Sequence, residues 1–166
     1  MKGGCAVDFK IVQQLVEKFH TNDPFVLARE CNIKVLFADL GHLRGMYQYY
    51  KRARLIFLNQ TLPHGEQRAV CAHELGHALL HPKMNRFFLH QNTFFNCDRW
   101  EREANLFAAH LLIDEADARE YVLQGGSIQQ IAAATCLPAD LVEARMRSFV
   151  KEISKNEFQR EDTAMR

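Results

Sequence analysis

Hydrophobic residues in the first third of the chain recur with two different periods. Near the N-terminus they are spaced by three and four positions, at Phe9, Val12, Val16 and Phe19. That spacing places them on one face of a helix, which we expect to begin near Asp8. Three later stretches are instead rich in β-branched and aromatic residues, and they predict strands over 33–38, 46–50 and 55–58.

The rest of the chain has a helical pattern that glycine and proline interrupt. A short helix is expected after Asp23, because Pro24 suits the first helical position. Further along, Gly125 and Pro138 mark breaks between helices. The remaining predicted helices span 63–81, 98–113, 114–124, 127–135 and 138 to about 150. This order predicts an α+β fold with a small, mostly antiparallel three-stranded sheet, since the second and third strands read as a hairpin.

The length of 166 residues suits about one domain. Within it we expect a core over residues 1–113 and a helical C-terminal part over 114–153 that packs on the core. The last stretch, 154–166, is polar and is expected to be frayed.

Composition and charge narrow the class of protein. The chain is 48% hydrophobic and 25% charged, which is ordinary for a folded globular protein. Its net charge of +1 provides no strong field to attract nucleic acid or an anionic membrane. No hydrophobic run approaches the roughly 18 residues of a membrane span, and the first ten residues lack the apolar stretch of a signal peptide. The five cysteines include no C-x-x-C pair, which favours free thiols in a reducing cytoplasm.

The segment from His73 to His77 reads H-E-L-G-H. Residues four apart on a helix lie about 40° from each other around the axis and about 6 Å along it, so both imidazoles can converge on one metal ion. Glu74 lies about 100° round from His73, where it can touch a water at the metal without being a ligand. Two imidazoles, a carboxylate and an open fourth position are typical of a catalytic zinc site.

The next predicted helix supplies a candidate third ligand in the segment E-R-E-A-N. Glu101 and Asn105 are four residues apart and therefore share a face of this helix. Glu101 would complete a set of two histidines and one glutamate, and Asn105 can hydrogen bond to a ligand imidazole and fix its tautomer. Glu103 lies about 200° from Glu101 and is expected to face elsewhere. His81 continues the histidine spacing but lies too far round to bind the same ion, so we expect it at the helix end.

These two motifs together resemble the ImmA/IrrE family of zinc metallopeptidases. The resemblance rests on R-A-V-C-A-H-E-L-G-H-A-L-L-H at 68–81, on E-R-E-A-N-L-F-A-A-H-L-L at 101–112, and on the strand L-I-F-L-N before them. It covers about residues 55–149 and implies a zincin-like metallopeptidase fold with an active-site helix.

The resemblance also implies a cofactor, a partner and residue roles. It implies Zn²⁺ bound by His73, His77 and Glu101, with Glu74 as the catalytic general base and Asn105 in a supporting position. The implied activity is that of an intracellular, cytoplasmic endopeptidase. Members of this family often cleave or inactivate helix-turn-helix repressors of mobile elements or stress responses, so such a repressor is the expected protein substrate.

Two features have no role in this pattern. No motif identifies the group that would stabilise an oxyanion, and the candidates by residue type alone are Tyr47, Tyr49, Tyr50 and His90. The stretch 82–97 has few helix signals and contains Phe87, Phe88, Phe94 and Phe95.

Two other functions stay open at this point. The first is a DNA-binding regulator, because residues 127–147 are spaced like a helix-turn-helix. However, Asp140 and Glu143 in its second helix would face phosphates, so a helical pair that packs on the core is preferred. The basic, tyrosine-rich hairpin at 44–54 could stack on nucleic acid, but a charged edge strand explains it better. We therefore expect no membrane partner and no direct binding of nucleic acid. The second alternative is a protein that sequesters a repressor and carries a zinc site that is not hydrolytic.

Overall fold

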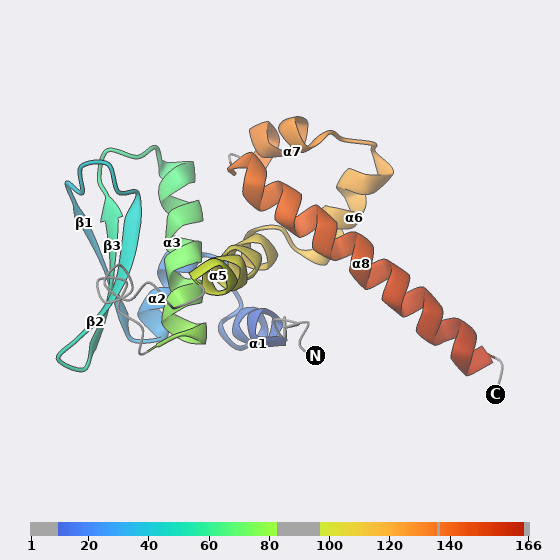
Figure 1. Cartoon of the computed structure of the whole chain (residues 1–166), viewed down its shortest axis with the longest axis horizontal. Helices are drawn as coiled ribbons and strands as arrows, with labels where there is room; N and C mark the ends of the chain where they lie inside the picture. Colours follow the sequence, from blue (N-terminus) through green and yellow to red (C-terminus); the bar gives the residue numbers. More distant parts are fainter. Residues whose placement is uncertain (1–9, 83–96, 136, 165–166) are drawn as a thin grey trace.

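The computed structural model describes residues 10–82, 97–135 and 137–164. Its elements, in chain order, are α1 (Lys10–Phe19), α2 (Pro24–Glu30), β1 (Ile33–Ala38), β2 (Gly45–Tyr50), β3 (Ala53–Asn59), α3 (His64–Leu80), α5 (Cys97–Leu112), α6 (Glu115–Leu123), α7 (Ile128–Thr135) and α8 (Ala139–Ala164). The sheet lies at one end of the molecule, α3 lies beside it, and α5 separates α3 from the C-terminal helices (Figure 1). The protein is of the α+β class, as the sequence predicted.

The three strands form a mixed sheet in the order β1–β3–β2. β2 and β3 pair antiparallel as the predicted hairpin, and Lys51 and Arg52 form its two-residue turn with φ of 46° and 67°. β1 pairs with β3 in parallel, so the expectation of a mostly antiparallel sheet is corrected to one pairing of each kind. Burial accounts for this order, because β3 carries the fully buried Ile56 and Leu58. In the central position, both edges of this strand are hydrogen bonded to neighbouring strands.

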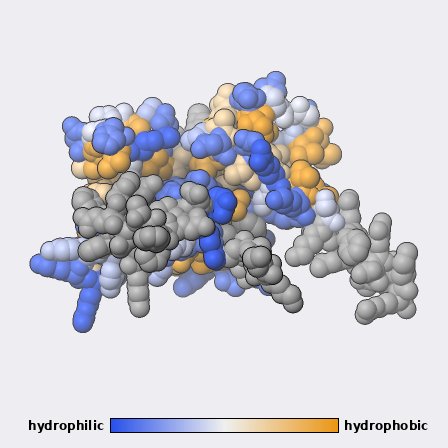
Figure 2. All heavy atoms as spheres, viewed as in Figure 1, coloured by the Kyte–Doolittle hydropathy of each residue, from blue (hydrophilic) through white to orange (hydrophobic). Residues whose placement is uncertain are grey.

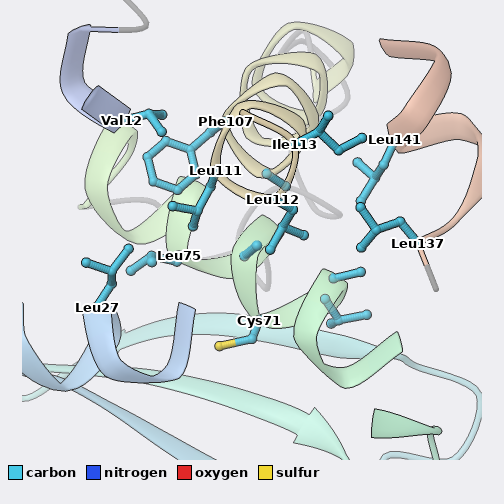
Figure 3. Close-up of a cluster of buried hydrophobic side chains, with 14 of the residues drawn as sticks. Val12, Leu27, Cys71, Leu75, Phe107, Leu111, Leu112, Ile113, Leu137 and Leu141 are labelled. Atoms are coloured by element: carbon cyan, nitrogen blue, oxygen red, sulfur yellow. The ribbon is translucent and has the colours of Figure 1, made fainter. Parts of the chain in front are cut away.

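α3 is the helix that positions the candidate site, and its middle is buried on several sides. Leu75 lies toward Leu27 of α2, and Cys71 lies toward the sheet (Figure 3). Gly76 permits a close crossing of the two helices, since a Cβ atom there would lie 3.1 Å from Cα of Ala104 and 3.2 Å from Cβ of Phe107. The helix with the two histidines therefore meets the helix with the E-R-E-A-N segment almost backbone to backbone.

The C-terminal helices pack on the end of α5. Leu112 and Ile113 lie toward Leu137, which precedes α8, and toward Leu141 in the first turn of α8 (Figure 3). Arg145 of α8 is only 2% exposed, and its Nε donates a hydrogen bond of 2.9 Å to the carbonyl of Ile113. A buried guanidinium is costly unless its donors are used, so this bond helps to tie α8 to α5.

α8 is longer than the sequence predicted. The helix was expected to end near residue 150, with 154–166 frayed, but it continues through Ala164. Its last turns are rich in lysine, glutamate, glutamine and arginine, which favour helix without giving an apolar stripe. α8 consequently extends beyond the rest of the molecule (Figure 1).

Hydrophobic residues also reach the surface near the α6–α7 end of the molecule (Figure 2). Val122 and Leu123, at the end of α6, are 47% and 80% exposed. Among the described residues, no helix combines the length and the apolar composition that crossing a membrane requires.

Candidate metal centre

α3 directs the imidazoles of His73 and His77 to one place. The two residues are four apart, and their ring centroids lie 4.7 Å from each other. Their Nε2 atoms are 3.0 Å apart, so both rings present the same nitrogen to a shared point. Because other sides of α3 are packed in the core around Cys71 and Leu75, the helix cannot turn its histidines away without exposing buried apolar surface.

α5 adds a carboxylate at the same point. One carboxylate oxygen of Glu101 lies 3.3 Å from Nε2 of His73, and the other lies 3.5 Å from Nε2 of His77. The ligand atoms of the three residues all lie within 4.8 Å of one another. In the described parts of the chain, this is the one group of three or more histidine, cysteine or acidic residues with such spacing.

The spacing of these atoms suits a small tetrahedral cation. Donor atoms held about 2.0–2.1 Å from an ion at tetrahedral angles are about 3.3–3.4 Å from one another. The two nitrogens are 3.0 Å apart, and each lies 3.3 or 3.5 Å from a different oxygen of Glu101, so every separation is close to that value. His73, His77 and Glu101 could therefore hold one metal ion with little movement and leave a fourth position open.

Asn105 supports one of these imidazoles from one turn further along α5. Its Oδ1 lies 2.8 Å from Nδ1 of His73. An amide oxygen accepts hydrogen bonds, so Nδ1 carries the proton and Nε2 keeps its lone pair toward Glu101. This is the tautomer that a metal ligand at Nε2 requires.

The electrostatic environment of His73 favours a positive charge. Burial works against the charged imidazolium, but the hydrogen bond that the imidazolium donates to Glu101 and the charges of Glu74 and Glu101, with a further bond to Asn105, raise the pKa of His73 above its ordinary value. The same negative surroundings would stabilise a metal cation, which must displace that proton in order to bind.

Glu74 lies on α3 directly after His73 and is 2% exposed. Its negative charge helps to raise the pKa of His73, one of the three converging residues. It does not belong to the group of three ligand atoms. Glu74 is therefore a buried carboxylate that follows a candidate ligand in the sequence and stands outside the group that the ligands form.

His81 and Glu103 form a contact that the sequence did not predict. His81 caps the end of α3, as expected, and its Nε2 lies 3.2 Å from Oε2 of Glu103. Glu103 was expected to face elsewhere, but it lies against the same helix as Glu101 and is 9% exposed rather than solvated. Burial lowers the pKa of His81 despite the nearby carboxylate. Helical spacing gave no signal for this pair, because it depends on the angle at which α5 crosses α3.

The structure describes three of the four residues that were considered as oxyanion stabilisers. Tyr47 is buried, and its hydroxyl donates a hydrogen bond of 2.9 Å to the carbonyl of Pro82. This bond gives Tyr47 a structural use at the end of α3, and Tyr49 and Tyr50 lie on the same edge strand, β2. His90 and the four phenylalanines named above lie outside the described residues.

The helix-turn-helix-like region has little basic surface to offer DNA. Arg145 is buried, and its Nη1 lies 3.4 Å from Glu152. Arg147 is exposed but forms an ion pair with Glu143 on the same face of α8. These contacts favour a packing role for α7 and α8 over a role in binding phosphates.

Two histidines lie one turn apart on α3, with a buried glutamate between them in the sequence, and α5 adds a carboxylate beside them. This arrangement, next to a small sheet, is that of a metallopeptidase. Comparisons with known proteins agree. The family model of the IrrE N-terminal-like domain, a peptidase family, matches residues 28–155. The chain belongs to this family.

Two relatives span most of both chains. Metallopeptidase ImmA of Bacillus subtilis (strain 168) is 32% identical over 154 residues, which cover 89% of this chain and 90% of the relative. The uncharacterized immunity region protein 2 of Bacillus phage phi105 is 38% identical over 141 residues, which cover 84% of this chain and 89% of the relative. This family confirms the resemblance seen in the motifs and makes the protein a metallopeptidase.

Proposed function

We propose that the metal is zinc and that His73, His77 and Glu101 are its ligands. The observation that carries this proposal is the convergence of two Nε2 atoms, 3.0 Å apart, and one carboxylate whose oxygens lie 3.3 and 3.5 Å from them. Imidazole nitrogen suits zinc better than magnesium or calcium, which prefer oxygen ligands. When bound, zinc supplies Lewis acidity, which lowers the pKa of a water at the open position and polarises a peptide carbonyl.

Glu74 is the general base in this proposal. Its carboxylate accepts a proton from the attacking water and passes it to the amine that leaves when the peptide bond breaks. Asn105 keeps the lone pair of His73 directed at the ligand position throughout, because its oxygen holds the proton on the opposite nitrogen. The buried position of Glu74 strengthens its electrostatic effect on groups at the site.

The proposed substrate is a helix-turn-helix repressor of a mobile element or stress response, cut in the cytoplasm. The family resemblance supports this choice, and the phage relative is named for an immunity region. The cut bond should lie in a flexible or locally unfolded segment, because a chain must be extended to reach a zinc held between two helices beside a sheet. We assign catalysis to a core over 1–113, and selection of the substrate also to the helical part over 114–153.

The proposal is tested by mixing the zinc-loaded protein with its cognate repressor. We expect one or two discrete fragments, which a chelator and Glu74→Gln both abolish, while the Glu74→Gln variant still binds the intact repressor. An intact repressor that is nevertheless bound by the wild-type protein would favour sequestration without cleavage. An intact repressor together with nanomolar binding of a DNA site in physiological salt would favour the DNA-binding regulator.

A further inference from the structure

α6 ends with two hydrophobic side chains that the rest of the described protein leaves largely exposed. Val122 is 47% exposed and Leu123 is 80% exposed, the highest value among the large hydrophobic residues that the structure describes. The opposite side of the same helix is packed, because Ala118 is fully buried and Tyr121 packs against the core. Isolated exposed leucines are common, so the surroundings of this pair decide whether it has a use.

The end of α6 is fixed in a way that does not use these two side chains. Gly125, with φ of 64°, donates a backbone hydrogen bond of 3.1 Å to the carbonyl of Val122. Gly126 donates one of 3.2 Å to the carbonyl of Tyr121. These two bonds form a Schellman motif, whose usual hydrophobic contact joins the positions of Tyr121 and Gly126, not that of Leu123. The backbone therefore holds Leu123 in place, and its side chain is presented to solvent on an ordered helix end.

The surroundings of this pair are acidic. Residues 114–143 include six acidic side chains and one basic side chain, and all seven are exposed. The basic residue is Arg119, and its guanidinium lies 3.2 Å from the carboxylate of Glu115, so its charge is already matched. This part of the chain consequently carries an excess of negative charge, although the whole chain has a net charge of +1.

Two of the acidic residues share the exposed side of α6 with Leu123. Asp117, Glu120 and Leu123 follow one another at three-residue spacing, which places neighbours side by side on a helix. Partial burial, and then the charge of Asp114 with a smaller contribution from Glu120, raise the pKa of Asp117 above its ordinary value. In the described part of the chain, no lysine or arginine forms an ion pair with Asp117 or Glu120. Both carboxylates can therefore attract a positively charged partner.

We propose that this acidic face of α6, formed by Asp117, Glu120, Val122 and Leu123, docks the basic DNA-reading surface of the repressor before the cut. A surface that binds DNA carries lysine and arginine to neutralise phosphates, so its charge complements that of α6. An apolar centre inside a polar rim is also the usual anatomy of a protein interface. The inference rests on the proposed function, because the partner is the proposed substrate, and it adds where that substrate is recognised.

Binding is measured with the Glu74→Gln protein, which leaves the repressor uncut. Leu123→Ser and Glu120→Lys, each added to Glu74→Gln, should raise the dissociation constant for the repressor about 10-fold or more, since a central apolar contact is lost or a like charge is introduced. The controls make the same changes elsewhere on the surface. Leu43→Ser in the loop before β2 and Glu17→Lys on α1 should bind like Glu74→Gln alone.

Salt and DNA test the chemistry of the docked surface. Rising salt should weaken the binding, because exposed charges attract one another less when they are screened. An excess of operator duplex should abolish it, because the repressor surface that reads DNA is the one that α6 covers.

The kinetics of the cleaving protein separate docking from catalysis. In the protein that retains Glu74, Leu123→Ser should raise KM for the repressor about 10-fold and leave kcat unchanged. A short peptide that spans the cut bond lacks the basic surface, so wild type and Leu123→Ser should cleave it with the same kcat/KM. Loss of peptide cleavage in Leu123→Ser would show damage to the catalytic part and would contradict the inference.

The inference is overturned if Leu123→Ser and Glu120→Lys bind the repressor like the two controls, or if the repressor binds operator DNA and the protein together. It is also overturned, in favour of a second copy of this chain, if the wild type sediments as a dimer that Leu123→Ser dissociates without loss of repressor affinity. A wild-type protein that neither binds nor cuts the repressor would instead overturn the proposed substrate itself.

Discussion

Oδ1 of Asn105 lies 2.8 Å from Nδ1 of His73, and this single bond joins α5 to α3 through an imidazole. Without the bond, the ring of His73 can rotate or adopt the other tautomer, in which Nε2 carries the proton. Asn105→Ala should therefore weaken zinc binding about 10–100-fold, while Asn105→Asp, which keeps the acceptor, should retain most of it. The dissociation constant for zinc measures both, and Asn22→Ala, at an exposed loop residue, is the control. Equal affinity in Asn105→Ala and wild type would remove this role.

The choice of Glu101 as a ligand is tested against its exposed neighbour. Glu101→Ala removes the oxygens that lie 3.3 and 3.5 Å from the two histidines, so zinc affinity should fall by more than about 100-fold, beyond the loss expected for a supporting residue. Arg102→Ala changes a solvent-facing side chain on the same turn and should leave the metal content unchanged. Similar zinc loss in both variants, measured by metal analysis after dialysis, would mean that the helix face is wrongly assigned.

The close crossing at Gly76 predicts a sensitive position. Gly76→Ala places a methyl group 3.1 Å from the α5 backbone, so the helices must separate, at a cost of about 1–3 kcal/mol in the free energy of unfolding. The same separation moves Glu101 away from the histidines and should weaken zinc binding. Gly126→Ala adds its methyl group at 3.5 Å, an ordinary contact distance, and serves as the matched control. Denaturant unfolding and zinc titration of both variants provide the comparison. The crossing would not be tight if Gly76→Ala behaved like Gly126→Ala.

Much of the candidate site could be predicted from local helix geometry. His73 and His77 share a face because they are four apart, and the same holds for Glu101 and Asn105. The structure brings these four side chains together. Their packing partners could not be predicted in the same way. The contact of Glu103 with His81 depends on the angle at which α5 crosses α3. That angle is set by the close packing of the two helices and cannot be read from the period of either helix.

Parts of the fold were also beyond local patterns. The hairpin of β2 and β3 was predicted from adjacent strands and a short turn. The parallel pairing of β1 with β3, which places Ile33 opposite Arg54, could not be predicted in this way, because β2 lies between these two strands in the sequence. Such a pairing is decided by which strand buries the most apolar surface. The end of α8 was missed for a different reason, because its last turns have helix-favouring residues and no apolar stripe.

His110 predicts a dependence of stability on pH. Burial, and then the charge of Arg145, lower the pKa of His110 to about 3 in the folded protein, below the ordinary value of 6.5. As the pH falls below 6.5, the unfolded chain takes up a proton here that the folded protein refuses, so the folded state loses stability. Between pH 7 and pH 5 the loss from this group should be roughly 2 kcal/mol.

His110→Gln removes this titration and should flatten the acid dependence. The free energy of unfolding of the metal-free protein, measured with urea at pH 7 and pH 5, should fall by roughly 2 kcal/mol less than in the wild type. His64→Gln, at an exposed histidine near the start of α3, should behave like the wild type. The assignment is wrong if wild type and His110→Gln lose equal stability over this range.

The proposed peptidase reaction requires Glu74 to act as a base and not as a metal ligand. Glu74→Gln keeps the size of a side chain that is 2% exposed and leaves the three converging groups untouched. The decisive measurement is the zinc content of this variant together with its rate of repressor cleavage, both beside wild type. We predict about one zinc per chain in both proteins and a fall in cleavage rate of at least about 100-fold in Glu74→Gln, the lower end of what a general base contributes. A variant that keeps its zinc and cleaves at the wild-type rate, or one that loses its zinc, would contradict the account.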